Sequence, residues 1–380
     1  MKVKKVIPFN RPLFLGGERD ALNQVIESGT LSGNGPYTNL CEQWLEHYSG
    51  ALAALLTPSC THALEMAALL INIEPGDEVI MPSWTFVSTS NAFVLRGAVP
   101  VYVDVEPDTC NLDVELVESA ITNRTKAIVP VHYGGISCDI GAIMDVAKRN
   151  NLWVIEDAAQ ALMSSYDGAP VGSIGHLGTY SFHATKNYTS GGEGGALLVN
   201  APELVERARV IREKGTNRED FISGNVSRYE WVDVGSSYLP GELQAAYLYT
   251  QLKQAQKVNQ CRSRLWEEYR TSLAPFSENK GLRLPCPPRY AAHNGHMFFV
   301  RARDRAEKDR LLIGLNQAGI MAQTHYEPLH MSCAGKRFGR FYGSDIHTLD
   351  IYDTLIRLPL YYSLGDEEQQ YVIDKLKMLL

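Results

Sequence analysis

The chain has 380 residues, of which 45% are hydrophobic and 21% are charged, and its formal net charge is −7. This length and composition are typical of a globular enzyme with two domains, or with one large core and a smaller appendage. The negative charge argues against a nucleic acid or an anionic membrane as the main partner. No apolar run approaches the roughly 20 residues that span a bilayer.

The N-terminus is basic over residues 1–5, but Pro8, Asn10 and Arg11 follow before the apolar core of a signal peptide could form. The seven cysteines are scattered, odd in number and without a C-x-x-C pair. This spacing predicts neither a disulfide framework nor a zinc site, and it is typical of reduced thiols. We therefore expect a cytoplasmic protein.

Short apolar runs alternate with helix-like stretches through the first half of the chain. The expected strands lie within residues 50–56, 78–82, 99–104, 127–131 and 152–155, and the expected helices lie at 63–71, after Phe86 and over 140–150. Strands that are apolar on both faces are typical of a parallel sheet covered by helices on both sides. The alternation therefore predicts an α/β core.

A long helical pattern with a break inside it runs from about residue 240 to residue 273, and a proline-rich stretch follows at 284–288. A strand is expected at 297–301, and helices at 306–319 and 366–379. We predict a large α/β domain with a central, mostly parallel sheet over residues 1–245. Residues 246–380 are predicted to hold the long helix and a smaller α+β domain.

Asp157 follows the apolar strand at 152–155, and ligands of open α/β sheets bind beyond the carboxyl ends of the strands. A carboxylate there is costly to bury without a cationic partner. Asp157 could cap the following helix, or it could pair with a pyridinium nitrogen.

Lys186 lies between an apolar, aromatic strand and the glycine cluster 191–195. Most lysines are solvated surface groups, so the residue alone means little. The glycines let the backbone bend tightly beside a ligand. An aromatic, apolar wall lowers the pKa of an amine, which a Schiff-base lysine requires.

The turn at residues 59–63 runs directly into a helix, where the hydroxyls of Ser59 and Thr61 and free backbone N–H groups could hold a phosphate. A plain Ser/Thr helix cap explains the turn equally well. Phe86 follows the next strand. Its ring could stack on a flat cofactor, or it could pack in the core.

Taken in order, the segments 59–64, 82–86, 156–160, 181–186 and 192–195 resemble the DegT/StrS-type sugar-nucleotide aminotransferases. The resemblance covers nearly the whole chain. It implies a fold-type-I aminotransferase that uses pyridoxal 5′-phosphate (PLP) and works as a homodimer with active sites at the subunit interface. L-glutamate is the implied amino donor, and a nucleotide-linked 4-keto-6-deoxy sugar is the implied acceptor.

The same resemblance assigns roles to individual residues. Lys186 and Asp157 become the catalytic pair, with the cofactor carried on Lys186 and its ring nitrogen paired with Asp157. The other residues expected to bind the cofactor are Gln160 at the phenolic oxygen, Phe86 on the ring, and Ser181, Ser59, Cys60 and Thr61 at the phosphate. His183, Tyr37 and Tyr188 are candidates for the sugar pocket.

One position departs from the family pattern. Many members carry an asparagine before the helix near residue 240, and it reaches the phosphate in the partner subunit. Ser237 stands there in this chain. A serine side chain is shorter than an asparagine side chain, so the backbone at Ser237 would have to lie closer to the partner's phosphate for the same contact.

The sequence fits four other functions less well. Sugar dehydratases of the same fold replace the lysine by histidine, so the retained Lys186 argues against them. No G-x-G-x-x-G follows the first strand, as a dinucleotide-binding oxidoreductase would require. The histidines lack the spacing of metal ligands, and a silent regulator would need a damaged lysine or phosphate site. Amination at C3 of the sugar, or of a GDP- or UDP-linked sugar, stays open.

Overall fold

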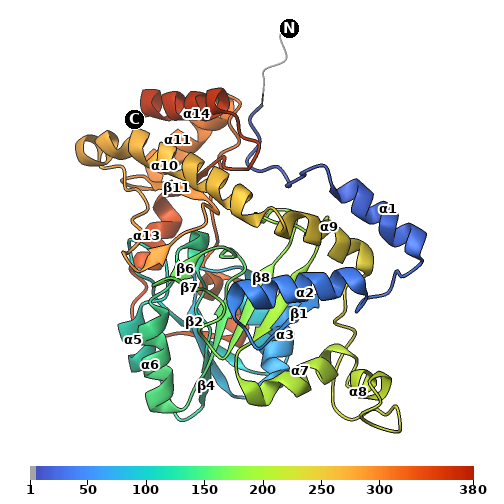
Figure 1. The fold of residues 1–380 in the computed structure, drawn as a ribbon. Helices are drawn as coiled ribbons and strands as arrows, with labels where there is room; N and C mark the ends of the chain where they lie inside the picture. The colour runs from blue at the N-terminus through green and yellow to red at the C-terminus, as the bar shows by residue number, and fades with distance from the viewer. Residues whose placement is uncertain (1–5) are drawn as a thin grey trace.

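The computed structural model describes residues 6–380; the basic residues 1–5, on which part of the signal-peptide argument rests, lie outside the described chain. An eight-stranded sheet forms the centre of the molecule (Figure 1). In spatial order its strands are β1 (Ala53–Thr57), β9 (Gly195–Val199), β8 (Leu177–Ser181), β5 (Trp153–Asp157), β4 (Thr125–Ile128), β2 (Glu78–Pro82), β3 (Val99–Val103) and β12 (Arg340–Phe341).

The sheet is mostly parallel, as predicted. Each pair from β8 across to β12 is parallel, whereas β9 runs antiparallel to both of its neighbours. Because most strands point the same way, their carboxyl ends meet at one edge, and the loops that follow them gather there.

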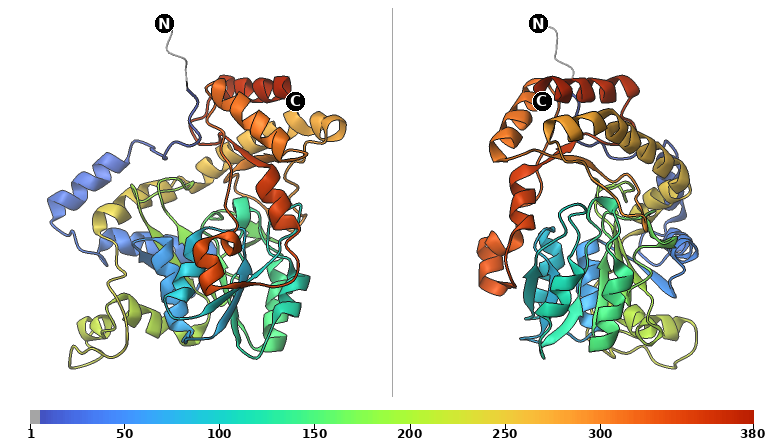
Figure 2. Two further views of the ribbon diagram at one scale, coloured as in Figure 1. Left: turned by 180° about the vertical axis from the view of Figure 1, so that it is seen from behind. Right: turned by 90° about the vertical axis from the view of Figure 1, so that its left-hand side faces the viewer.

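Helices cover both faces of the sheet (Figure 2). Alternate strand residues point to opposite faces: Leu55 belongs to one cluster of buried side chains and Ala54 to another. The helices on the first face are α3 (Cys60–Leu70), α4 (Val87–Val94) and α7 (Val205–Arg212). Those on the other face are α2 (Pro36–Ser49), α5 (Val114–Ala120), α6 (Ile140–Asn150) and α9 (Glu242–Leu252).

A second core forms around the C-terminal part of the chain. Its elements are α10 (Ala255–Lys280), β11 (Phe298–Arg301), α11 (Arg305–Gln317), β13 (Leu355–Leu358) and α14 (Asp366–Leu379). Two segments link this part to the first core: Ile7 packs in the second core, and β12 extends the large sheet beside β3. The division after residue 245 stays a prediction.

The long helix is interrupted as expected, because α9 ends at Leu252 and α10 begins at Ala255. The sequence patterns missed several shorter elements, namely α1 (Glu18–Ser28), α2, α8 (Arg218–Ile222), α12 (Cys333–Phe338), α13 (His347–Thr354), β6 (Ser165–Tyr166), β7 (Ala169–Pro170) and β10 (Ala291–Ala292). A usable signal existed for α1 and α2. Both end at glycines, Gly29 and Gly50, with φ of 70° and 75°, the left-handed conformation that glycine favours.

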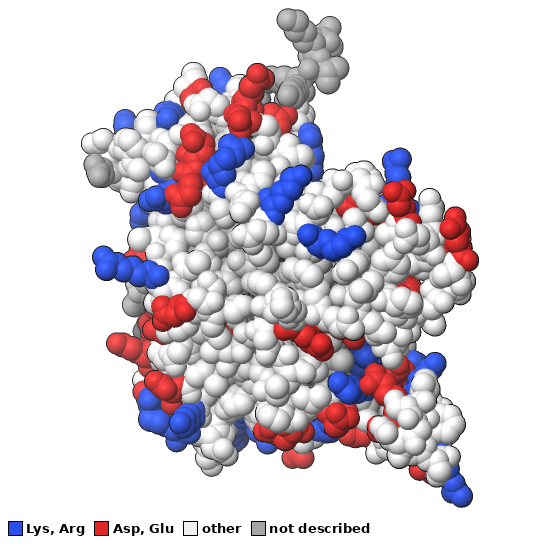
Figure 3. Space-filling model, viewed as in Figure 1, with Lys and Arg blue, Asp and Glu red and all other residues white. Residues whose placement is uncertain are grey.

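Charged side chains are mixed on the face shown in Figure 3: lysine and arginine lie among aspartate and glutamate, and the middle of this face carries few charges. No helix over residues 6–380 is long and apolar enough to cross a membrane.

Candidate active site

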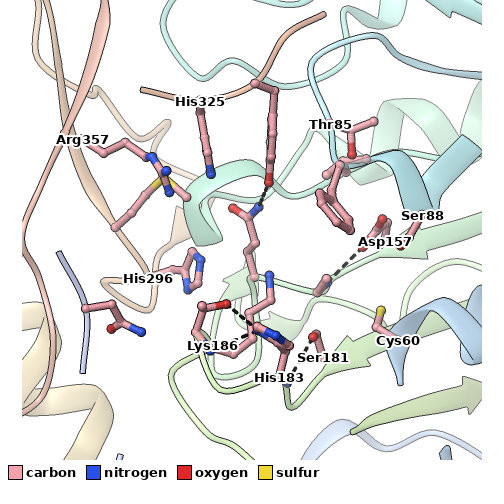
Figure 4. A pocket seen from close by; sticks show the side chains of 18 of the residues that line it. Cys60, Thr85, Ser88, Asp157, Ser181, His183, Lys186, His296, His325 and Arg357 are labelled. Atoms are coloured by element: carbon pink, nitrogen blue, oxygen red, sulfur yellow. Dashed lines mark hydrogen bonds between the residues drawn. The ribbon is translucent and has the colours of Figure 1, made fainter. Parts of the chain in front are cut away.

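A cavity of about 660 Å³ lies at the carboxyl ends of the central strands. Residues from both cores line it: Asp157 ends β5, Ser181 ends β8, and Arg357 comes from β13. The segment around Phe9 closes one side. Figure 4 shows the side chains that converge on this space from several elements. A cavity at this edge of a parallel sheet is the usual ligand position for the fold.

Asp157 is buried at the floor of the cavity. Its Oδ2 accepts a hydrogen bond from Thr89 Oγ1 at 2.7 Å, and its Oδ1 accepts one from the backbone N–H of Ala159 at 3.2 Å. Thr85 supports this arrangement, because its hydroxyl lies 2.8 Å from that of Thr89. Both donors to the carboxylate are neutral, so its negative charge is available to a cationic group in the cavity.

Lys186 lies in a turn after β8, and its backbone N–H donates to the carbonyl of His183 at 2.9 Å. The side chain is half-buried and lines the cavity. Burial lowers the pKa of Lys186, while the nearby Cys60 and Asp157 act in the opposite direction. A larger fraction of the amine is therefore unprotonated near neutral pH than for a solvated lysine, and this form is the nucleophile and the base.

Hydroxyl groups surround the N-terminus of α3 at one end of the cavity. Ser59 caps the helix by accepting a hydrogen bond from the backbone N–H of His62 at 3.2 Å. Thr61 Oγ1 lies 2.7 Å from Ser88 Oγ, and Ser181 faces the same space. Hydroxyls and free N–H groups at a helix N-terminus form a phosphate-binding arrangement. Cys60, predicted at the phosphate, also lines the cavity.

Gly195 allows β9 to pass directly against this helix start. A Cβ atom at Gly195 would lie 2.3 Å from the backbone nitrogen of Cys60, a distance at which the two segments would have to separate. The glycine cluster noted in the sequence therefore brings β9 close to the N-terminus of α3.

Gln160 and Phe86 lie on two other walls. Gln160 Oε1 accepts a hydrogen bond from the N–H of Gly134 at 2.7 Å, and its Nε2 donates to Tyr326 Oη at 3.2 Å. The amide is therefore oriented by the protein before a ligand binds. Phe86 is 57% exposed and lines the cavity, so its ring surface is free to contact a flat ligand. The structure does not place this ring in the core.

His183 lies at the cavity wall with a defined tautomer. Its Nδ1 accepts the backbone N–H of Thr185 at 3.2 Å, so in the neutral ring the proton is on Nε2. Nε2 lies 3.5 Å from Glu193 Oε1. Both side chains are substantially exposed and line the cavity, so they can meet the polar groups of a substrate.

Three predicted site residues do not line the cavity of this chain. Tyr188 is buried in the core, and its hydroxyl donates to the carbonyl of Ala255 at 2.9 Å. Its assignment to the sugar pocket is corrected, because the side chain has no exposed surface to offer. Tyr37 donates to Gln24 at 2.7 Å, away from the cavity. Ser237 is exposed and pairs through its backbone with Glu213.

Sequence reasoning missed several residues of the site. Ser88 and Thr89 lie in the first turn of α4, and a sequence signal existed because a run of hydroxyl residues, 88–90, begins two positions after Phe86. His296, His325 and Arg357 come from the C-terminal part of the chain and meet Lys186 only in the folded protein (Figure 4). Burial lowers the pKa of both histidines, and the positive charges of Lys186 and Arg357 lower it further.

The residues of the cavity fit PLP. The Asp157 carboxylate, which has only neutral donors among the described residues, suits a protonated ring nitrogen, and the hydroxyls at α3 suit the phosphate. The amine of Lys186 stands in the same cavity. Together with the large, mostly parallel sheet, this site defines a fold-type-I PLP-dependent aminotransferase.

The chain belongs to the DegT/DnrJ/EryC1/StrS aminotransferase family, whose model matches residues 16–377. It is 33% identical over 379 residues to the spore coat polysaccharide biosynthesis protein SpsC of Bacillus subtilis, covering 98% of this chain and 96% of SpsC. PseC of Helicobacter pylori, an aminotransferase involved in the biosynthesis of pseudoaminic acid, has a TM-score of 0.89 and 27% identity, with 99% of each chain covered.

The structure of Spr1654 from Streptococcus pneumoniae in its PLP form has a TM-score of 0.90 and 27% identity; the match covers 99% of this chain and 98% of that one. The protein is therefore a PLP-dependent transaminase of a sugar aminotransferase family, and it transfers an amino group from a donor to a keto sugar.

Proposed function

We propose that this enzyme transfers the amino group of L-glutamate to the 4-keto carbon of dTDP-4-keto-6-deoxy-D-glucose. The product is dTDP-4-amino-4,6-dideoxy-D-galactose, an amino sugar for a surface polysaccharide such as the enterobacterial common antigen. The observation that carries the aminotransferase chemistry is the convergence of Lys186 and Asp157 in one cavity. The choice of sugar is supported by segments that resemble the transaminase of that pathway, among them residues 56–61, 85–89 and 212–218.

In this proposal Lys186 and Asp157 divide the chemistry. Bound PLP supplies an electron sink for the electron pair released at the reacting carbon. The unprotonated Nζ of Lys186 removes the proton from the amino-bearing carbon of the donor and later returns a proton to the sugar carbon. The Asp157 carboxylate, held by Thr89 and by the N–H of Ala159, keeps the ring nitrogen protonated.

The remaining residues bind and orient. Ser59, Cys60, Thr61 and Ser181 hold the phosphate at the start of α3; Phe86 covers the ring, and Gln160 meets the phenolic oxygen with its oriented amide. His183 lines the sugar side together with Glu193. Burial lowers the pKa of Lys186, which favours the unprotonated amine at the point where substrate and cofactor meet.

The active unit in this proposal is a homodimer. Exposed apolar side chains, Ile26, Leu40 and Leu243, lie on α1, α2 and α9, and these helices pack side by side. They contribute to the face with few charges in its middle (Figure 3). Burying such a patch against a second copy removes apolar surface from water. Ser237 is exposed and Tyr37 is partly buried, and both lie outside the cavity of their own chain, so in this proposal they are available to the partner's site.

An absorbance spectrum tests the chemistry. Purified protein loaded with PLP should be yellow, and L-glutamate should bleach the band as the cofactor takes up the amino group. Lys186→Ala should lose the lysine-linked absorbance and turnover. A colourless protein that does not take up added PLP, or a Lys186→Ala variant with full turnover, would overturn the proposal.

A panel of acceptors tests the sugar. The aminated enzyme should regain its yellow colour with dTDP-4-keto-6-deoxy-D-glucose, and NMR of the product should show an axial amino group at C4. A 3-keto sugar, and GDP- and UDP-linked 4-keto sugars, serve as the competing acceptors. Faster recovery with one of these would replace the proposed substrate while leaving the aminotransferase chemistry intact.

A further inference from the structure

Arg357 is a cation in the cavity wall that faces no anion of the protein. Its Nε and Nη2 both donate to the carbonyl of Thr324, at 3.2 and 2.8 Å, and Nη2 lies 3.4 Å from Gln323 Oε1. These acceptors are neutral, and no carboxylate among the side chains that the structure describes comes within 4.0 Å of the guanidinium. A half-buried guanidinium without a counter-charge is costly, and a bound anion would offset that cost.

Two other arginines, both buried, differ from Arg357 in their partners or in their position. Arg301, also from the second core, pairs with Asp350. Arg262 lacks a carboxylate partner too, but its N–H groups reach three backbone carbonyls, and it is buried away from the cavity. Arg357 combines an uncompensated charge with access to the ligand space.

The orientation of Arg357 leaves one edge open. Its guanidinium carbon lies 4.4 Å from the centre of the Phe9 ring, which covers one face. The edge formed by Nε and Nη2 is directed at the carbonyl of Thr324. Among the described residues, Nη1 has no hydrogen-bond partner, so the end of the fork formed by Nη1 and Nη2 remains for a ligand. Two parallel N–H groups in this geometry match the two oxygens of a carboxylate.

The position of Arg357 indicates which anion it meets. Arg357 and the phosphate end of the site, marked by Cys60 and Ser181, lie on opposite sides of Lys186 in Figure 4. Its charge also reaches Lys186, adding to the lowering of the amine pKa that burial causes. In an amino acid the carboxylate is attached to the carbon that bears the reacting nitrogen. In a 4-keto sugar nucleotide several bonds separate the reacting carbon from the nearest phosphate.

We propose that the Nη1–Nη2 edge of Arg357 binds the α-carboxylate of the amino donor and so selects an amino acid in the first half of the reaction. The inference rests on the proposed function, in which L-glutamate donates to the site at Lys186. Gln323 and Thr324 position the guanidinium through hydrogen bonds, and the Phe9 ring packs against one of its faces.

The two half-reactions separate the roles of donor and sugar. The variants are Arg357→Gln and Arg357→Lys, and the control is Arg264→Gln, which changes a 57% exposed arginine paired with Asp366 at the surface. Single-turnover bleaching by L-glutamate is measured against donor concentration, and the reverse half-reaction is measured with the amino sugar nucleotide. Calorimetric binding of 2-oxoglutarate to the PLP-loaded enzyme, which has no amino group to transfer to it, gives a readout that needs no turnover.

Arg357→Gln should weaken L-glutamate and 2-oxoglutarate by about 10- to 100-fold, the range for losing a charge-assisted pair. The lysine variant should recover part of this loss, and the amino sugar should bind within about twofold of the wild type. L-glutamine, which carries only the α-carboxylate, should lose the same factor as L-glutamate. The Arg264→Gln control should match the wild type in every measurement.

Unchanged binding of both acids in Arg357→Gln would overturn the inference. So would a loss confined to the amino sugar, which would make a phosphate the anion, or a loss with L-glutamate but not L-glutamine, which would make it the γ-carboxylate. Should Arg357→Gln fail to fold, Arg357→Lys decides, since unaltered affinity for both acids in that variant refutes a bidentate contact. A wild-type enzyme that ignores L-glutamate refutes the proposed function instead.

Discussion

Thr89 and Asp157 offer a direct test of how the protein tunes its cofactor site. The Thr89 hydroxyl donates to a buried carboxylate oxygen over 2.7 Å. Thr89→Val keeps the shape of the side chain and removes this donor. A hydrogen bond to a charged group contributes about 1.5–3 kcal/mol, so the anionic carboxylate is destabilised by about that amount. If that carboxylate keeps the ring nitrogen protonated, the donor half-reaction should slow by about 10- to 150-fold.

The assay is single-turnover bleaching of the PLP-loaded enzyme by saturating L-glutamate. Thr89→Ser, which retains the hydroxyl, should stay within about threefold of the wild type, because little of the hydrogen-bond energy is lost. Thr85→Val removes a group that contacts Thr89 but not the carboxylate, so its effect should be intermediate. Cofactor occupancy, measured by absorbance after denaturation, should be close to that of the wild type in all three variants.

Equal rates for Thr89→Val and the wild type would refute this reasoning. An equal loss of rate in Thr89→Ser would also refute it, because the effect would then follow from packing instead of from the hydroxyl.

Three further outcomes are expected. Gly195→Ala should lower PLP affinity at least about tenfold by equilibrium dialysis, because the added Cβ would lie 2.3 Å from the backbone nitrogen of Cys60 and force the two segments apart; unchanged affinity would contradict the role of this close packing. Burial lowers the pKa of Lys186, so its charged form destabilises the folded state at low pH, and this cost disappears as the pH rises past the unfolded-state pKa of about 10.4. Lys186→Met should therefore raise the melting temperature of the cofactor-free protein at pH 7, and a gain that persisted above pH ~10.4 would argue against this cause. Burial alone would raise the pKa of Glu156, but His132 and backbone N–H groups lower it overall. Glu156→Gln should therefore lower the free energy of unfolding, measured in urea, by about 2–4 kcal/mol at pH 7 and by less below the ordinary glutamate pKa of about 4.3. An equal loss at both pH values would exclude the charge as the cause.

The strands and helices of the large sheet followed from local patterns. Runs such as residues 78–82 and 152–155 are apolar on both faces, and a strand covered by helices on both sides requires this composition. The helices at 140–150 and 366–379 were predicted with the bounds that the structure has. In contrast, β12 has two residues, and no short-range pattern indicates that it joins β3 from the other end of the chain.

For the site, the sequence by itself determined the chemistry carried on consecutive segments. Asp157 ends a strand, the Ser59–Thr61 turn starts a helix, and Lys186 lies in the turn that follows β8. Strand order and the common direction of parallel strands bring such ends together, so their convergence could be anticipated. Only the tertiary structure decided that Tyr188 is buried in the core and that Thr89 supports Asp157. It also decided that Arg357 enters the cavity from the second core, because packing between distant segments leaves no periodic signal along the chain.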